Sequence, residues 1–477
     1  MEYDVVIGLE FHAQLSTQSK IFCECSTIFG AEPNSQVCPV CMGLPGVLPV
    51  LNRKVVENAI MTGLALNCET ARRCKFDRKN YFYPDLPKNY QISQYDDPLA
   101  KNGFLEIPVD GTTKRIGITR VHMEEDAGKL IHSEDGPESY VDFNRTGVPL
   151  LEIVTEPDIR SPEEAYATAL MLKGILEYLD VSDCNMEEGS LRCDANISIR
   201  PKGATELGIK AEVKNMNSFK AVQKALEYEA ARQQNVLAES GVVVQETRLW
   251  DADRGVTRSM RGKEEAHDYR YFPEPDLIPL IIDDAWIEEI TARLPELPAR
   301  RKQRLQEEYG ISEYDAGVLT ASKHTADFFE RAARQYPDAK TVGNWVMGEL
   351  QRYLNQEDMD IRQCSMSPER LIELLRLIDD GTISGKIAKD VFAEMFNTGE
   401  SPAAIVESQG LVQIADENEL VPLVDTVIAE NPGPVADFLG GNERTFGYLM
   451  GQAMKASKGK ANPKIVSRLL RERLQKH

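Results

Sequence analysis

The chain has 477 residues, of which 42% are hydrophobic and 27% are charged, which is the composition of an ordinary soluble protein. The length predicts about three domains, and no apolar run reaches the roughly 18 residues that a membrane span requires. The net charge of −21 argues against a protein that coats nucleic acid nonspecifically.

The chain begins with MEYDVVIGLE, which is acidic at its start and runs directly into a predicted strand. This pattern fits neither a secretory signal nor an arginine-rich transit peptide, so we expect a cytoplasmic protein. From Val5 to Leu15 every odd position is apolar, which is typical of a half-buried strand. Glu10 and His12 therefore share the opposite face. That face is either a wet outer surface or part of a site.

Four of the nine cysteines are grouped in the pattern C-x-C-x12-C-x2-C. Pro39 and Gly43 permit a tight turn around the second pair, and four thiolates without another obvious ligand indicate a closed structural zinc site. Four buried or free thiols are the alternative. The proposed zinc ligands are Cys23, Cys25, Cys38 and Cys41.

Strand patterns and helix patterns are mixed in the first 290 or so residues. Strands are predicted over 114–123, 148–154, 195–200 and 210–215. Helices are predicted over 161–179 and 218–237, and each begins with a serine suited to an N-cap. Because no regular β-α-β repetition occurs, we expect an α+β fold.

Carboxylates recur on several of these predicted strands. An acidic triplet, Glu124 to Asp126, follows one strand, and Glu152 lies inside an apolar run where an ionised carboxylate is costly unless it is paired or bound to a metal. Glu212 shares a strand face with Lys214. Together with His12, these oxygens suit Mg²⁺ that also contacts phosphate, although each could simply form a salt bridge. No glycine-rich phosphate loop is present.

Proline-rich and glycine-rich breaks divide the rest of the chain. LPELPAR, residues 294–300, is followed by an almost wholly helical stretch that ends at NTGESPA, residues 397–403. We therefore predict domains at 1–293, 294–403 and 404–477. The last 23 residues contain eight Lys or Arg and one acid, so the tail is either a solvated terminal helix or a polyanion contact.

A long segment, FDRKNYFYPDLPKNYQISQY at 76–95, resembles the B subunit of the bacterial tRNA-dependent amidotransferase family. The resemblance extends nearly end to end. The other matching segments are 7–15, 43–52, 120–129, 186–198, 212–219, 264–277 and 450–463.

The resemblance implies a cradle domain related in fold to glutamine synthetase and guanidino kinases, with a zinc knuckle, followed by a helical domain and a small helical tail. It also implies a reaction on misacylated Glu-tRNA(Gln) or Asp-tRNA(Asn). The side-chain carboxylate takes the γ-phosphoryl group of ATP, and ammonia then displaces phosphate. A partner amidase subunit supplies the ammonia from glutamine, and a small third subunit completes a heterotrimer. The resemblance implies no membrane partner.

The resemblance also suggests roles for individual residues. The catalytic residues and Mg²⁺ ligands would be Glu10, His12, Glu125 and Glu152, with Glu212 as a further metal ligand. Nucleotide or substrate contacts would come from Lys79, Arg192, Asn196 and Lys214. The tRNA contacts of the tail would be Lys455, Lys458, Lys460 and Lys464.

Two other functions remain open from the residues alone. One is an RNA-binding assembly subunit, in which the acidic residues only build salt bridges. The other is a free-standing ligase similar to glutamine synthetase, which would act on a small acid without tRNA. Loss of residues 404–477 would leave such a ligase unaffected, whereas an amidotransferase would lose affinity for tRNA.

Overall fold

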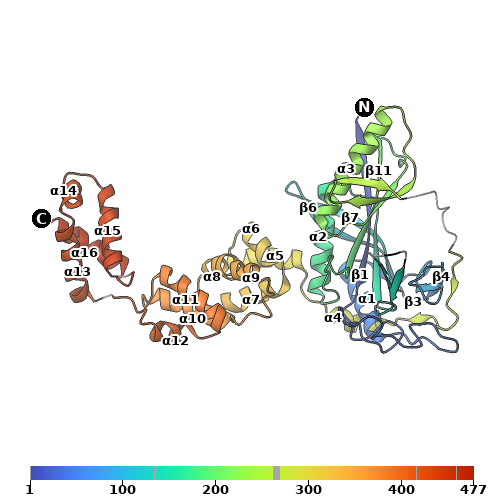
Figure 1. Ribbon diagram of the computed structural model, residues 1–477, viewed down its shortest axis with the longest axis horizontal. Helices are drawn as coiled ribbons and strands as arrows, with labels where there is room; N and C mark the ends of the chain where they lie inside the picture. The colour runs from blue at the N-terminus through green and yellow to red at the C-terminus, as the bar shows by residue number, and fades with distance from the viewer. Residues whose placement is uncertain are drawn as a thin grey trace. The chain divides into compact units, whose positions relative to one another are not determined.

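The computed structural model describes residues 2–133, 136, 138–260, 269–414, 416–457 and 459–476. The chain divides into two compact units, 1–298 and 299–477 (Figure 1). Among the described helices, none combines the length and apolar character needed to cross a membrane. The predicted division into 1–293, 294–403 and 404–477 stays a prediction.

A large sheet forms the centre of the first unit, in the order β14-β13-β12-β11-β1-β10-β7-β5-β4-β15, with β6 paired to β7 and β2 to β6. Its strands are β1 Tyr3–Gln14, β2 Glu69–Thr70, β4 Asp77–Asn80, β5 Tyr90–Ser93, β6 Ala100–Val109, β7 Thr112–Glu125, β10 Pro149–Thr155, β11 Leu191–Pro201, β12 Ala211–Lys214, β13 Glu246–Asp251, β14 Val256–Ser259 and β15 Phe272–Pro273. Two small pairs complete the strands: β3 Arg73–Cys74 with β16 Leu280–Ile281, and β8 Lys129–His132 with β9 Ser139–Asp142.

The alternation in β1 determines which face of this sheet is packed. Ile7, Leu9 and Phe11 are at most 1% exposed and belong to the main hydrophobic core. That core also takes in residues of the helices of this unit, which are α1 Arg53–Ala65, α2 Pro162–Tyr178, α3 Phe219–Ala238 and α4 Asp284–Ala292. The even-numbered side chains of β1 therefore lie on the face away from this core.

The two longest helices begin where their serines predicted. The Ser161 Oγ accepts a hydrogen bond from Glu164 N at 3.2 Å, and the Ser218 Oγ accepts one from Ala221 N at 3.1 Å. Both hydroxyls satisfy backbone donors that a helix start leaves unpaired. The helices pack on each other and on β6 and β11. The mixed α+β class is confirmed.

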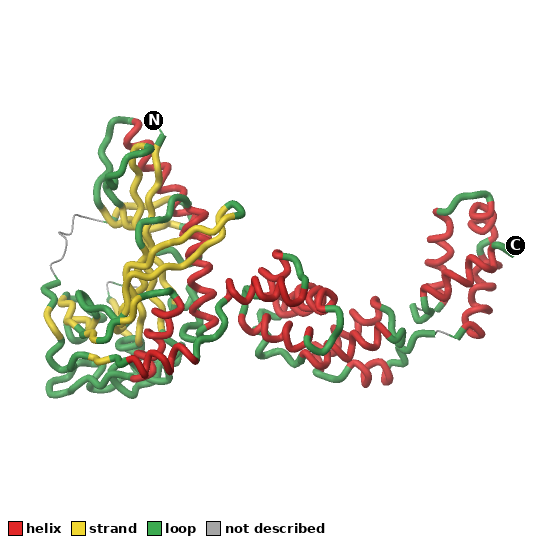
Figure 2. Tube along the Cα trace, turned by 180° about the vertical axis from the view of Figure 1, so that it is seen from behind, coloured by secondary structure: helices red, strands yellow, loops and turns green. Residues whose placement is uncertain are grey.

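The second unit is helical (Figure 2). Its helices are α5 Pro298–Tyr309, α6 Glu313–Leu319, α7 Lys323–Ala333, α8 Ala339–Trp345, the π-helical turn η1 Val346–Leu350, α9 Gln351–Gln356, α10 Pro368–Asp379, α11 Gly385–Thr398, α12 Pro402–Ser408, α13 Glu417–Glu430, α14 Pro432–Leu439, α15 Arg444–Ala456 and α16 Pro463–Leu474. The helices pack around two hydrophobic clusters, one within 305–406 and one within 420–474.

Candidate functional site

Three neighbouring strands bring acids and imidazoles together on the face of the sheet opposite the helices. In the antiparallel register, His12 of β1 lies opposite Glu152 of β10, and Glu152 lies opposite His122 of β7. Residues directly opposite each other on antiparallel strands project to the same side. Glu10 and Glu124, each two positions along its strand, share that face.

These five residues form what we call the acid–histidine cluster. The His12 Nε2 atom lies 3.5 Å from Glu124 Oε1, 3.5 Å from Glu152 Oε2 and 3.8 Å from Glu10 Oε1. His122 Nε2 lies 3.4 Å from Glu152 Oε2 and 3.7 Å from Glu124 Oε2. The side chains of Glu124 and Glu152 are 4% and 8% exposed, while Glu10 is 28% exposed, so the cluster opens toward solvent at Glu10.

The charges in this cluster depend on each other. Burial opposes ionisation of Glu152, but the His122 and His12 imidazoles outweigh burial and hold the pKa of this carboxyl well below its usual range. Burial alone would lower the pKa of His122, and the Glu152 and Glu124 carboxylates instead raise that pKa to about 9. Burial and the Glu152 charge raise the pKa of Glu10. A nearby positive charge is therefore required to keep these closely spaced carboxylates ionised.

A second acidic group adjoins the first and shares His12 with it. The ligand atoms of Glu10, His12 and Asp194 all lie within 4.8 Å of one another, as do those of His12, Glu124 and Glu152. Asp194 is the register partner of Glu10 on β11, which explains its position. Asp194 was not predicted as a site residue from the sequence. Extending the alternation of the predicted strand 195–200 back by one residue would have placed Asp194 on the same face as Asn196.

Glu125, which was predicted to be a Mg²⁺ ligand, lies outside the acid–histidine cluster. Its neighbour Glu124 is the residue that lies beside His12. The register of β7 with β10 shifts between Val154 and Thr155, so Thr119 has no partner there. Such a bulge changes which face successive residues occupy. The apolar positions of β7 accordingly switch from Ile116 and Ile118 to Val121 and Met123. This switch leaves His122 and Glu124 on the sheet face opposite the helices.

Glu125 instead forms an ion pair with Lys88 and accepts a hydrogen bond from Ile92 N at 2.8 Å. It is 2% exposed and lines a cavity of about 90 Å³ together with Lys88 and two of the grouped cysteines, Cys23 and Cys41. This position places Glu125 beside the grouped cysteines and not in the acid–histidine cluster.

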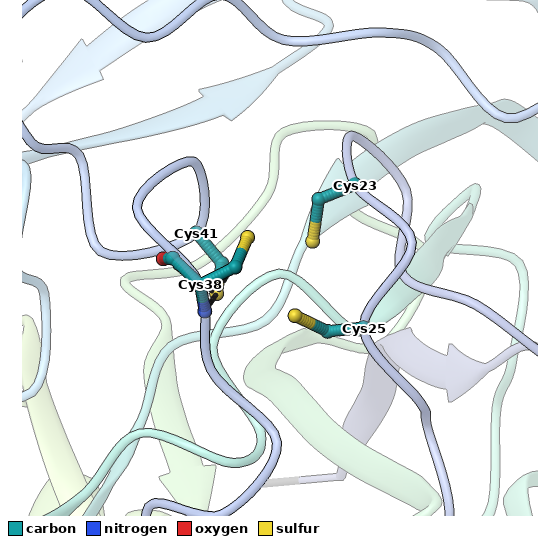
Figure 3. Close-up of side chains that lie close together, drawn as sticks. All are labelled: Cys23, Cys25, Cys38 and Cys41. Atoms are coloured by element: carbon teal, nitrogen blue, oxygen red, sulfur yellow. Dashed lines mark hydrogen bonds between the residues drawn. The ribbon is translucent and has the colours of Figure 1, made fainter.

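The four grouped cysteines converge from two loops, with their sulfur atoms facing one another (Figure 3). The sulfur atoms of Cys23, Cys25, Cys38 and Cys41 all lie within 4.8 Å of one another. Those of Cys38 and Cys41 are 3.9 Å apart. In tetrahedral zinc sites the Zn–S distance is about 2.3 Å, which separates the sulfurs by roughly 3.8 Å. The donor set and its spacing therefore fit zinc.

Similarity to known proteins extends over both units of the chain. The family model of the GatB/GatE catalytic domain matches residues 5–288, and that of the GatB domain matches residues 327–474. A relative from Carboxydothermus hydrogenoformans is 62% identical over 478 residues, covering 100% of this chain and 99% of the relative. That relative is named as the B subunit of an aspartyl/glutamyl-tRNA(Asn/Gln) amidotransferase. This chain belongs to the same family.

Two further relatives with the same name agree with this assignment. The one from Thermoanaerobacter pseudethanolicus is 60% identical over 476 residues, and the one from Geotalea daltonii is 58% identical over 478 residues. Each match covers 100% of both chains. The resemblance found in the sequence is confirmed.

Two of the three cations predicted to contact nucleotide or substrate, Arg192 and Lys214, lie near the acid–histidine cluster of this amidotransferase chain. Arg192 is the register partner of His12, and its Nη2 lies 3.0 Å from Asp126 Oδ2. Lys214 Nζ lies 2.7 Å from Asp194 Oδ2 and 3.0 Å from Glu212 Oε1. Glu212 is thus paired with Lys214, and it accepts a hydrogen bond from the Thr247 hydroxyl at 2.8 Å. Asn196 lies opposite Glu212 on β11.

A group of tyrosines accompanies Lys79. The Lys79 Nζ lies 4.9 Å from the ring centroid of Tyr269, and Tyr95 stacks on Tyr271 with 4.0 Å between centroids. Burial raises the pKa of Tyr271, and the negative charges of Glu152 and Glu124 raise it further. Tyr271 is therefore within electrostatic reach of the acid–histidine cluster. These tyrosines were not predicted as site residues, although all three stand in the matching segments 76–95 and 264–277.

The tail lysines differ in their surroundings. Lys455, in the last turn of α15, and Lys464, in the first turn of α16, are exposed. Lys460 is half-buried, and its Nζ donates to the carbonyl of Gly410 at 2.5 Å. Lys458 lies outside the described residues, as do positions 264–268 of the matching segment 264–277.

Proposed function

We propose that this chain is the amidating subunit of an aspartyl/glutamyl-tRNA(Asn/Gln) amidotransferase. Its full-length relatives are named for that enzyme. The observation that carries the chemical assignment is the position of His12 Nε2, 3.5 Å from both Glu124 and Glu152 on the sheet face opposite the helices. The substrates are Glu-tRNA(Gln), Asp-tRNA(Asn) or both, together with ATP.

The reaction has two steps that follow from carboxylate chemistry. A carboxylate is a poor acyl donor, so one of its oxygens first attacks the γ-phosphorus of ATP, and the bond to the ADP oxygen breaks. Ammonia then attacks the carbonyl carbon, phosphate leaves, and the nitrogen loses a proton to give the amide. Phosphoryl transfer of this kind depends on positioning and on neutralising negative charge.

The residues present fit a Mg²⁺ site in this reaction. His12, Glu124 and Glu152 would hold the ion, with Glu10 and Asp194 beside it. Mg²⁺, when bound, neutralises phosphate charge and lessens the repulsion between ATP and the substrate carboxylate. In this proposal Glu124 occupies the role that was predicted for Glu125 from the sequence. Glu212 is paired with Lys214 and supports the site through that cation.

The basic side chains beside the acids provide contacts for anionic groups. Lys214 and Arg192 stand next to the cluster on β12 and β11, where each is held by an aspartate. Such pairs keep a cation in place until phosphate or a substrate carboxylate competes for it. Lys79 and Asn196 complete the predicted nucleotide and substrate contacts.

The zinc site has a structural role in this proposal. Four cysteine ligands leave no open coordination position for substrate, so zinc would hold the two cysteine loops together. The first unit would be the cradle domain related to glutamine synthetase and guanidino kinases. The second unit would comprise a helical domain and a tail that contacts tRNA through the predicted lysines.

The partners belong to the same proposal. An amidase subunit would supply ammonia from glutamine, and a small third subunit would complete a cytoplasmic heterotrimer. The word subunit in the names of the relatives supports an assembly of several chains.

The test is ADP formation by the purified complex with each misacylated tRNA, with and without Mg²⁺. We expect ADP to form only when misacylated tRNA and Mg²⁺ are both present. ADP formed with free glutamate or aspartate alone would favour the free-standing ligase. Binding of tRNA without any ADP formation would favour the RNA-binding assembly subunit, and either result would contradict the proposal.

A further inference from the structure

Lys20 is a fully buried lysine beside the grouped cysteines. Its relative exposure is 0%. The ammonium donates to the carbonyl of Gln36 at 2.7 Å and to that of Phe143 at 3.5 Å, and it lies 3.7 Å from Cys41 Sγ. These three partners match the three N–H groups of a lysine ammonium.

Cys41 is the proposed zinc ligand that this ammonium contacts. Of the carboxylates that the structure describes, none forms an ion pair with Lys20, and the two other hydrogen-bond partners are neutral carbonyls. A buried ammonium without an opposite charge is very costly. Cys41 Sγ also accepts a hydrogen bond from Cys38 N at 3.2 Å. Two donors are thus directed at one proposed ligand sulfur, and they would stabilise its negative charge in the zinc-bound site.

Lys20 also contacts the other cysteine pair. Its backbone N donates to the carbonyl of Cys25 at 3.0 Å. One residue therefore connects the loop of Cys23 and Cys25, through its backbone, to the loop of Cys38 and Cys41, through its side chain. Its stem also lies close to Gly147, whose φ of +80° allows the chain to turn there.

We propose that Lys20 supplies the counter-charge of the four-thiolate zinc site. The inference rests on the zinc site proposed above. Four thiolates and one Zn²⁺ carry a net charge of about −2, and the ammonium reduces the net charge of the buried group to about −1. Lys20 is a positioning residue in this role, because it touches a ligand sulfur and not the reacting substrates. Partners of this kind change metal affinity by about 10–100-fold.

The test is the rate of zinc transfer from the full-length protein to a colorimetric chelator. The variants are Lys20→Met, which removes the charge, and Lys20→Arg, which keeps it, with Lys54→Met as the control at an exposed lysine at the start of α1. We expect zinc to leave Lys20→Met about tenfold faster or more. The Lys20→Arg and Lys54→Met variants should release zinc at close to the wild-type rate.

Equal zinc release from Lys20→Met and wild type would overturn the inference. So would release from a folded Lys20→Arg that is as fast as from Lys20→Met, because charge would then not be the cause. Should Lys20→Met be insoluble, Lys20→Gln replaces it, because the amide keeps a hydrogen-bond donor for the two carbonyls. Its rate of zinc release is then compared with that of the wild type in the same way. Wild-type protein that contains no zinc would refute the zinc site itself. Zinc-loaded wild type with unaffected variants would refute only the role of Lys20.

Discussion

His12 and Glu152 stand directly opposite each other on neighbouring antiparallel strands, with His12 Nε2 and Glu152 Oε2 3.5 Å apart. They are far apart in the chain, and the register of β1 with β10 alone brings them together. His12 is also the member shared by the two acidic groups on this face. The imidazole therefore marks the centre of the proposed Mg²⁺ site.

The two adjacent glutamates of β7 should respond differently to Mg²⁺. Glu124 faces His12, whereas Glu125 pairs with Lys88 on the other side. We predict that Glu124→Gln raises the Mg²⁺ concentration for half-maximal ADP formation about tenfold or more, because it removes a ligand charge. Glu125→Gln should leave that concentration unchanged, whatever its effect on the maximal rate. An equal rise in both variants, measured by magnesium titration, would contradict this assignment.

Removing one thiol should remove the zinc. We predict that Cys38→Ser purifies with less than half of the zinc of the wild type, since three thiolates and a hydroxyl bind zinc less well. Its melting temperature should fall by several degrees because the two cysteine loops lose their link. The matched control is Cys364→Ser, because Cys364 belongs to the second unit and is not a member of the four-cysteine group. Metal analysis that finds equal zinc in both variants would refute the site.

A buried carboxylate in the second unit should make its stability depend on pH. Glu330 is 4% exposed and accepts hydrogen bonds from Arg301 Nε at 2.8 Å, Arg304 Nη2 at 2.8 Å and Arg334 Nη2 at 3.0 Å. Burial opposes its ionisation, but the Arg304 and Arg301 guanidinium groups outweigh burial and lower its pKa below 4.5. A lowered folded pKa stabilises the protein above the unfolded value, and that contribution is lost as the pH falls through the folded value.

Replacing Glu330 should therefore destabilise the second unit at neutral pH. We predict that Glu330→Gln lowers the free energy of unfolding of this unit by about 3 kcal/mol at pH 7, because three guanidinium groups lose their buried partner. The difference from wild type should shrink as the pH drops below 4.5. Denaturant melts at several pH values test this, with the exposed Glu407→Gln as the control. A difference that is independent of pH would contradict it.

The exposed lysines of the tail should contribute to tRNA affinity through charge alone. We predict that Lys455→Ala and Lys464→Ala each weaken tRNA binding and each reduce the slope of log affinity against log salt by about one. Lys460→Ala should weaken tRNA binding both by loss of charge and by loss of the hydrogen bond that its ammonium donates to the Gly410 carbonyl. Filter binding at several salt concentrations measures the slopes. Lys101→Ala, exposed on β6 of the first unit, is the control and should not change them.

Much of the fold follows from local patterns in the sequence. The period-two alternation of Ile7, Leu9 and Phe11 placed Glu10 and His12 on one face, and the serines before α2 and α3 marked where those helices begin. The spacing of the four cysteines indicated a group of thiols, which the structure brings together. These signals are local, so one sequence is enough to read them.

The composition of the cluster was less accessible to sequence reasoning. The choice between Glu124 and Glu125 depends on the bulge at Thr119 of β7, opposite Val154 and Thr155 of β10. This bulge changes the face that the following side chains of β7 occupy. Asp194 and Tyr271 reach the site through strand order, which local patterns do not determine. The buried contact of Lys20 with Cys41 likewise arises from packing between loops.

The most direct test of the proposed chemistry is tRNA-dependent ADP formation by the complex containing Glu152→Gln. This change removes the negative charge opposite His12 and leaves the shape of the side chain almost unchanged. We predict that the rate falls about 100-fold or more while tRNA binding is retained, and that Glu106→Gln, exposed on β6, keeps the wild-type rate. A Glu152→Gln complex that forms ADP as fast as wild type at saturating misacylated tRNA and ATP would contradict the proposed role of the acid–histidine cluster.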